Sequence, residues 1–180
     1  MTFRVLPVEP LADGWTVSDA ALASIWRRLV AEERVERTFY AGGIANPESF
    51  IGFLKSPHVA ACIAIDEEAR QPAVLAWLTN VENVSAFAHY CVLSRPSRAA
   101  GRAVLSFWES LRNPAGEPLL DLLLGITPEI HQEALRVLRI LGFTSIGTIP
   151  RYCDCHYLGT RCGGVISYRE FARESAAGRP

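Results

Sequence analysis

The sequence predicts a mixed α/β fold of the α+β type, in which a mostly antiparallel central sheet of about six or seven strands is flanked by about four helices. Three apolar stretches typical of strands follow one another between residues 59 and 93, separated only by short polar turns. Stretches with helical spacing of apolar residues stand before and after them. Consecutive strands joined by short turns pair antiparallel, so we expect a mostly antiparallel sheet.

The expected strands are apolar or alternating runs bounded by Pro, Gly, Asn or Asp. Pro7 ends the first strand or places it at a sheet edge, because proline cannot donate a ladder hydrogen bond. The stretch 119–124 is almost entirely apolar, as expected of a strand buried on both faces. We expect strands over residues 3–8, 59–65, 73–79, 85–93, 119–124, 143–149 and 165–168.

The expected helices carry recognisable start and stop signals. Ser18 or Asp19 can cap the first helix, and Asn46 followed by Pro47 is typical of an N-cap with proline at the first helical position. Gly142 is the expected C-cap of the last helix. We expect helices over about residues 19–30, 46–54, 99–112 and 128–141.

The composition is that of an ordinary globular protein, with 49% hydrophobic and 21% charged residues. We expect one domain over residues 1–173 and a disordered tail over residues 174–180. The net charge of −1 gives no overall attraction to nucleic acid or to a membrane, so neither is expected as a partner. No signal peptide is evident, and the five cysteines are more typical of free thiols than of disulfides. We therefore expect a cytoplasmic protein, as a monomer or a homodimer.

One short segment, residues 98–104, carries the strongest functional signal. Its sequence, Arg-Ala-Ala-Gly-Arg-Ala-Val, connects an apolar strand to a helix-like stretch. A tight turn into a helix presents unpaired backbone N–H groups at the positive end of the helix dipole, and this geometry binds phosphate. Gly101 has no Cβ, so a ligand could approach the backbone there.

The charges around this segment favour the same interpretation. Residues 83–108 contain no acidic side chain but include Arg95, Arg98 and Arg102. Such a stretch suits a ligand that carries several negative charges. The alternative is a small-residue helix start that packs against a sheet and leaves its arginines in solvent.

Two segments together resemble the GNAT superfamily of acyl-CoA-dependent N-acyltransferases. Residues 98–103 match its Arg/Gln-x-x-Gly-x-Gly/Ala signature. Residues 131–143 are similar to its second motif, in which a polar residue is followed three positions later by alanine and the helix ends in Leu-Gly-Phe. The expected order of elements also resembles that of the superfamily from Phe3 to Tyr168.

The resemblance implies that acetyl-CoA (coenzyme A) is the cosubstrate, that the turn holds its diphosphate, and that no metal is needed. His131 stands where the superfamily usually has an asparagine that contacts the pantetheine arm. Leu138 stands where many members have a tyrosine that protonates the leaving thiolate, which leucine cannot do. The cofactor-binding residues implied by the resemblance are Leu93, Ser94, Arg98, Ala99, Ala100, Gly101, Arg102, Ala103 and His131.

The resemblance also implies direct attack of a primary amine, from a small molecule or a protein, on the acyl thioester. A backbone N–H around Leu93 or Ser94 would polarise the carbonyl, and splaying of the strands 85–93 and 119–124 would leave a slot for the pantetheine arm. His89 and Tyr90 are the catalytic candidates, because an imidazole titrates near neutrality and both residues precede the turn. A histidine satisfied inside the sheet is the alternative for His89. Glu82 is a further candidate base that would act through water.

The remaining chemistry-bearing residues leave alternatives open. Trp77 and the pair Phe39-Tyr40 could line an acceptor pocket or belong to the core. Zinc ligand types occur close together at Cys153, Cys155, His156 and Cys162, but their spacing lacks the usual gap of two to four residues. A hairpin or loop over residues 151–164 near the substrate opening, with turns at Gly159 and at Gly163-Gly164, is therefore favoured.

Three functions remain distinguishable at this point. The favoured one is an acyl-CoA-dependent N-acyltransferase. The alternative is a catalytically degenerate GNAT-fold protein that binds an acyl-CoA or serves as a scaffold, and the third is a small zinc-bearing interaction module.

Overall fold

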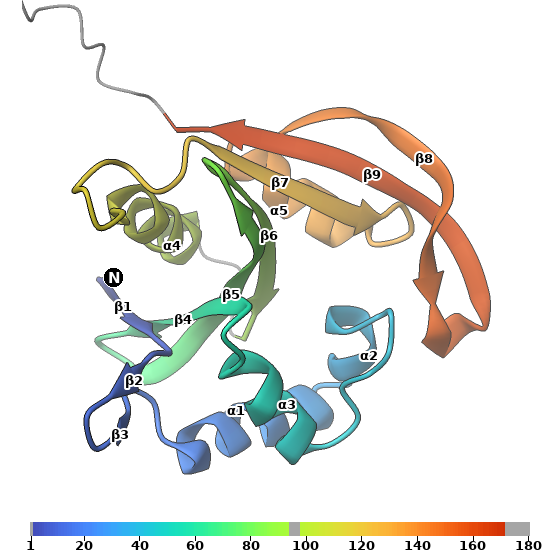
Figure 1. Cartoon of the computed structure of the whole chain (residues 1–180). Coiled ribbons are helices and arrows are strands. Elements are labelled where there is room, and N and C mark those ends of the chain that lie inside the picture. Colours follow the sequence, from blue (N-terminus) through green and yellow to red (C-terminus); the bar gives the residue numbers. More distant parts are fainter. Residues whose placement is uncertain (1, 94–97, 172–180) are drawn as a thin grey trace, which may run out of the picture.

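A computed structural model of the chain describes residues 2–93 and 98–171. In this part of the chain, one sheet has the strand order β1-β4-β5-β6-β7-β9-β8, and β2 and β3 form a separate hairpin (Figure 1). All neighbouring strands of the large sheet pair antiparallel except β6 and β7, which are parallel. The mixed, mostly antiparallel sheet predicted from the sequence is confirmed. No helix in the described ranges is both long and apolar enough to cross a membrane.

The strands are β1 (Phe3–Pro7), β2 (Pro10–Leu11), β3 (Gly14–Trp15), β4 (Val59–Asp66), β5 (Gln71–Glu82), β6 (Ser85–Val92), β7 (Leu122–Pro128), β8 (Thr144–Cys155) and β9 (Thr160–Glu170). The helices are α1 (Asp19–Ala31), α2 (Val35–Thr38), α3 (Pro47–Leu54), α4 (Arg98–Ser110), α5 (Gln132–Ile140) and the 3-10 turn η1 (His156–Leu158). The expected tail over residues 174–180 lies outside the described residues.

The helix signals read from the sequence act as predicted. Ser18 Oγ accepts a hydrogen bond from Ala21 N at 3.2 Å and begins α1. At α3, the Asn46 side chain accepts from Ser49 N at 2.8 Å and the Ser49 hydroxyl accepts from Asn46 N, which completes a capping box. Gly142 follows α5 with a φ of +83°, a conformation that favours glycine.

The boundary between β7 and α5 differs from the expected strand 119–124 and helix 128–141. Leu122 is the first residue that pairs with β6, opposite Ser85, so the strand begins only there. It then continues through Pro128, and the next N–H, of Glu129, still donates to Gly163 O on β9 at 2.8 Å. Pairing with β9 therefore keeps residues 125–128 in the sheet and delays the helix to Gln132.

Helices cover both faces of the sheet and divide the core into two layers. On one face, α4 and α5 pack against the sheet through apolar side chains such as Val104, Trp108 and Leu141. On the other face, α1 and α3 bury Leu22, Leu29, Phe50 and other side chains against Leu75 and its neighbours. Because side chains alternate along a strand, neighbouring residues of β5 and β6 belong to different layers.

Candidate functional site

The strands β6 and β7 begin side by side and then separate (Figure 1). Their parallel pairing joins residues 85–87 to residues 122–124, although β6 continues to Val92 and β7 to Pro128. The splaying of these two strands, which the resemblance implied, is confirmed.

The divergence leaves part of the β6 edge without a ladder partner in the described chain. The N–H of Leu93 donates to Ala73 O on β5 at 2.8 Å. Backbone groups alternate along a strand, so Tyr90 and Val92 direct their N–H and C=O groups to the opposite side, toward β7. The N–H of Leu93 is therefore committed to the sheet, so it is not the expected oxyanion donor, and Ser94, the other residue expected for this role, lies outside the described residues. The N–H groups of Tyr90 and Val92 have the orientation that such a donor needs.

The facing edge of β7 is open in the same way. Because Glu129 N–H donates to β9, alternation directs the C=O of Ile126 toward β6. Ile126 O accepts a hydrogen bond of 3.4 Å from the hydroxyl of the Tyr40 side chain, in place of one from the backbone N–H of a neighbouring strand. On the β6 side, the Arg34 guanidinium donates to Val92 O. Side chains from the segment around α2 thus reach carbonyl groups on both open edges.

The helix α4 begins at Arg98, close in sequence to the end of β6. Arg98, Ala99 and Arg102 are exposed, Ala103 is half-buried, and Ala100 is fully buried. The first turn carries no acidic residue, so the positive end of the helix dipole is reinforced by two arginines one turn apart. Ser94 and Arg95, which the sequence also associated with this turn, lie outside the described residues.

The space beside Gly101 is occupied, in contrast to the open approach expected from the sequence. A Cβ built on Gly101 would lie 2.5 Å from Leu141 Cδ2 and 3.0 Å from the Tyr90 hydroxyl oxygen. Only a void of about 20 Å³ remains between α4, β6 and α5. Gly101 therefore permits close packing of α4 against the rest of the fold. Leu141 belongs to the Leu-Gly-Phe segment, so the two sequence motifs meet at this contact.

The structure places His89 and Tyr90 on opposite faces of the sheet. Tyr90 points under α4, and burial raises the pKa of its phenol. His89 lies on the α2 face, where its ring stacks on Trp77 at 5.2 Å between centroids with an interplanar angle of 4°. His89 Nε2 and Thr79 Oγ1 share a hydrogen bond of 2.9 Å. The two side chains therefore cannot act together on one group.

Burial lowers the pKa of His89 to about 4. Transfer of the imidazolium from water into the apolar layer is unfavourable, so the neutral ring is stabilised at physiological pH. Trp77, only 3% exposed, stacks on Phe39 as well, with 5.5 Å between centroids. The rings of Phe39, Trp77 and His89 therefore form a continuous stack on the α2 face of the sheet.

Aromatic side chains from three segments gather near the open edge of β7. His131, just before α5, shares a hydrogen bond of 2.8 Å between its Nε2 and the hydroxyl of Tyr157 in η1. The Tyr40 ring lies edge-on to His131, with 6.0 Å between centroids. Burial, followed by the nearby Arg37 charge, lowers the pKa of His131. Sequence reasoning assigned no polar role to Tyr40 and missed Tyr157, because only tertiary contacts bring these residues together.

The segment 151–164 is the hairpin that the sequence favoured, and its tip contacts α2. Gly159 occupies the turn with a φ of +61°, whereas Gly163 and Gly164 lie inside β9, so the second expected turn is wrong. Packing favours glycine at both positions, since a Cβ on Gly163 would lie 2.7 Å from Thr148 Cγ2 and one on Gly164 would lie 2.9 Å from Ile126 Cγ2. The Sγ atoms of Cys155 and Cys162 lie 3.3 Å apart in a small buried cluster. Among the described residues, no group of three or more His, Cys, Asp or Glu side chains is arranged to hold a metal ion.

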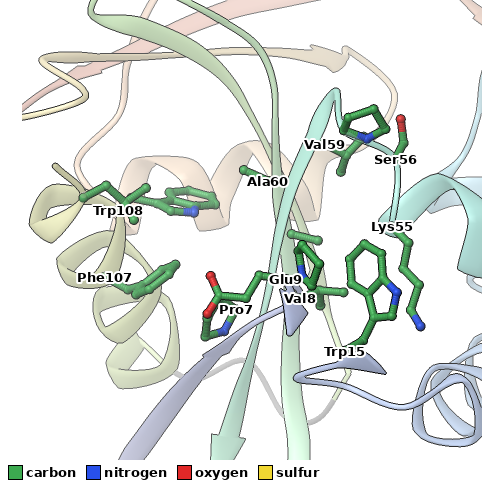
Figure 2. Close-up of a pocket in the computed structure, with 14 residues that line it drawn as sticks. Pro7, Val8, Glu9, Trp15, Lys55, Ser56, Val59, Ala60, Phe107 and Trp108 are labelled. Carbon is green, nitrogen blue, oxygen red and sulfur yellow. The ribbon is translucent and has the colours of Figure 1, made fainter. Parts of the chain in front are cut away.

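Two features lie away from the divergent strands. Glu82 is exposed and pairs with Ser85, at the end of β6 where β6 and β7 are still joined, so it does not reach the open edges. A hollow of about 360 Å³ lies between the end of β1, Trp15, Lys55 and the C-terminal half of α4 (Figure 2). It therefore lies toward the C-terminal end of α4, away from the positive N-terminal end.

Comparisons with known proteins agree with this architecture at the level of the fold. No protein-family model matches the sequence, and no curated protein matches it significantly. Solved structures do match over nearly the whole chain. A ribosomal-protein-S5-alanine acetyltransferase from Vibrio fischeri shares 12% identity with a TM-score of 0.66, covering 99% of this chain and 96% of that one.

Two further structures show the same similarity. An acetyltransferase from Salmonella typhimurium that modifies the N-terminal serine of ribosomal protein L7/L12 has a TM-score of 0.73 at 9% identity, covering 95% of this chain and 96% of that one. A spermidine N-acetyltransferase from Vibrio cholerae, in complex with CoA and spermine, has a TM-score of 0.67 at 8% identity, and the match covers 93% of this chain and 95% of that one. The chain has the fold of the GNAT acetyltransferases.

The packing role of Gly101 predicts that Gly101→Ala lowers the free energy of unfolding by about 1–2 kcal/mol, because the new methyl group overlaps Leu141. Gly52→Ala, at an exposed helical position with open space around it, should instead stabilise by about 0.5–1 kcal/mol. Urea unfolding measures the free energy of unfolding of both variants. The Gly101→Ala change is also measured in a protein that carries Leu141→Ala, which removes the overlapping side chain. An equal penalty for Gly101→Ala with and without Leu141 would contradict the proposed contact.

The buried state of His89 predicts a loss of stability in acid. Its pKa is lower in the folded protein than in the unfolded chain, so protons bind the unfolded chain preferentially as the pH falls from about 6.5 toward about 4. Between pH 7.5 and pH 5 the wild type should lose about 2 kcal/mol more than His89→Gln. Urea unfolding at the two pH values measures this difference. Equal acid-induced losses in the two proteins would show that His89 is not buried as a neutral ring.

Proposed function

We propose that this chain is an acyl-CoA-dependent N-acyltransferase that transfers an acyl group, with acetyl-CoA as the expected donor, directly to a primary amine. The observation that carries the proposal is the divergence of β6 and β7 beside the exposed start of α4. A positive helix end suits a diphosphate, and two open strand edges suit a chain that contains amide groups. Coenzyme A combines these two chemical features in one molecule.

The cosubstrate would bind along the following route. Its diphosphate would meet the N-terminal turn of α4, with Arg98 and Arg102 as exposed cations and with Ala99, Ala100 and Ala103 keeping the helix end narrow. Gly101 contributes through packing rather than through an open approach. Ser94 and His131 complete the proposed cofactor-binding residues, whereas Leu93 is not retained, because its side chain is buried and its N–H donates to Ala73 O. The pantetheine amides would pair with the open edge of β6 as an additional strand does.

The thioester would lie at the divergence, where the N–H groups of Tyr90 and Val92 face the open edge. A backbone N–H in this position stabilises the negative charge that develops on the thioester carbonyl oxygen. Tyr90 thus serves through its backbone, because its phenol is buried under α4. This assigns the residue to the site in a different role from that of a side-chain acid or base.

The acceptor amine would approach from the α2 face. His89 is the proposed base, because it lies on this face and Thr79 fixes its orientation; its pKa of about 4 makes it a weak base, so the amine must arrive unprotonated. A neutral imidazole nitrogen can accept the proton that the amine loses as the C–N bond forms. The structurally similar enzymes described above act on an N-terminal serine of a ribosomal protein and on spermidine. Both acceptors carry primary amines, and this is the acceptor class proposed for this chain.

A second candidate function is an acyl-CoA-binding protein without transferase activity. Leu138 favours it, since this side chain packs among apolar residues on the α4 face and carries no donor for a leaving thiolate. Incubation with acetyl-CoA and a panel of amines, with detection of released thiol, separates the two functions. Tight binding of acetyl-CoA without thiol release above background would favour the binding protein.

The proposed diphosphate site predicts that the double variant Arg98→Ala/Arg102→Ala binds CoA about tenfold more weakly than the wild type, because two charge-assisted contacts are lost. Arg112→Ala, an exposed arginine just past the other end of α4, is the matched control and should bind as the wild type does. Isothermal titration calorimetry with CoA and acetyl-CoA measures these affinities. No binding to the wild type at millimolar ligand would refute the proposed function.

A further inference from the structure

Leu138 packs on the α4 face and carries no group that could bond to a leaving sulfur, but a phenol reaches the divergent strands from the opposite face. Tyr40 follows α2 in the chain, and its hydroxyl donates to Ile126 O on the open edge of β7. Ile126 lies two residues beyond the last pair of β6 and β7, Phe87 with Leu124. The Tyr40 hydroxyl therefore lies at the beginning of the divergence.

This hydroxyl is held by a long hydrogen bond to Ile126 O and lies beside the Cys153 thiol, so its position is defined by two weak contacts. The distance of 3.4 Å to Ile126 O is long for an O–H···O hydrogen bond, whose usual length is about 2.7–2.8 Å. The backbone of the same residue is fixed, because Tyr40 O accepts from His156 N at 3.0 Å. The ring packs against the cluster of buried cysteines in the β8–β9 hairpin, as do the side chains of Ile126 and Tyr157. A better acceptor placed between β6 and β7 could take the hydrogen bond with little movement of the side chain.

We propose, on the basis of the proposed function, that the Tyr40 hydroxyl donates a hydrogen bond to the cosubstrate sulfur and stabilises the leaving thiolate. In the reaction, the amine nitrogen forms a bond to the thioester carbon. The C–S bond breaks with its electron pair on sulfur, and the amine gives up one proton to His89 or to solvent. Coenzyme A leaves as a thiolate that is hydrogen-bonded to Tyr40 and takes a proton from solvent on release.

The surroundings of Tyr40 suit a hydrogen-bond donor better than a proton donor. Burial, followed by the nearby Cys153 thiol, raises the pKa of the Tyr40 phenol. A phenol with a raised pKa remains protonated throughout the physiological range and keeps its proton when it meets a thiolate, whose ordinary pKa is about 8.5. A short contact between this hydroxyl and the sulfur lowers the energy of the charged leaving group without transfer of the proton.

The test is the pKa of the CoA thiol in its complex with the protein, titrated by ultraviolet absorbance of the thiolate and by calorimetry across pH. The wild type should lower this pKa by about one unit relative to Tyr40→Phe, since one hydrogen bond to a charged group is lost. Tyr152→Phe, which removes an exposed phenol from the same hairpin region, is the control and should match the wild type. The variant Tyr40→Phe should retain its affinity for the thiol form of CoA at low pH.

The outcomes separate this inference from the proposed function. CoA binding with the same thiol pKa in the wild type and in Tyr40→Phe would overturn the role of Tyr40 alone. Absence of CoA binding to the wild type would overturn both proposals. The wild type supplies a second measurement that needs no variant: its affinity for CoA, but not for S-methyl-CoA, should rise between pH 7 and pH 9. Equal pH dependence for the two ligands would also contradict the role of Tyr40.

Discussion

The early end of the pairing between β6 and β7 is the constraint on which the rest of the site depends. Each strand keeps a complete ladder on its other side, β6 with β5 and β7 with β9. The sheet therefore separates into two parts beyond residue 87. Backbone N–H and C=O groups at the separation need water, a side chain or a ligand, because unpaired polar groups in a buried setting are costly.

The segment around α2 connects the two parts of the sheet across this separation. Arg34, just before α2, donates to Val92 O on β6, and Tyr40, just after α2, donates to Ile126 O on β7. The same segment accepts the N–H of His156 from the β8–β9 hairpin. A helix of four residues, too short for stability of its own, is therefore held by contacts to both parts of the sheet. The segment around α2 thus borders the divergence on one face of the sheet, and α4 and α5 lie on the other face.

Much of the local structure could be predicted from the sequence, but the arrangement of the site could not. The capping residues Ser18 and Asn46 and the stop at Gly142 act within one or two turns of the chain, so their effect can be predicted locally. The role of Gly101 depends on Leu141, forty residues later, and a glycine beside a bound phosphate has the same sequence signature. The opposite directions of His89 and Tyr90 follow from alternation along β6, but only the helices on each face decide which layer each side chain enters. Tyr40 and Ile126 are brought together by topology alone.

Hydrogen–deuterium exchange at the backbone amides of β6 tests most directly whether the open edge is the binding site for CoA. The amide of Leu93, bonded to Ala73 O, should exchange slowly with or without ligand. The amides of Tyr90 and Val92 should exchange quickly in the free protein and become protected when CoA is added. If these two amides are as protected as Leu93 in the free protein, or remain unprotected at saturating CoA, the divergent strands do not hold the cosubstrate.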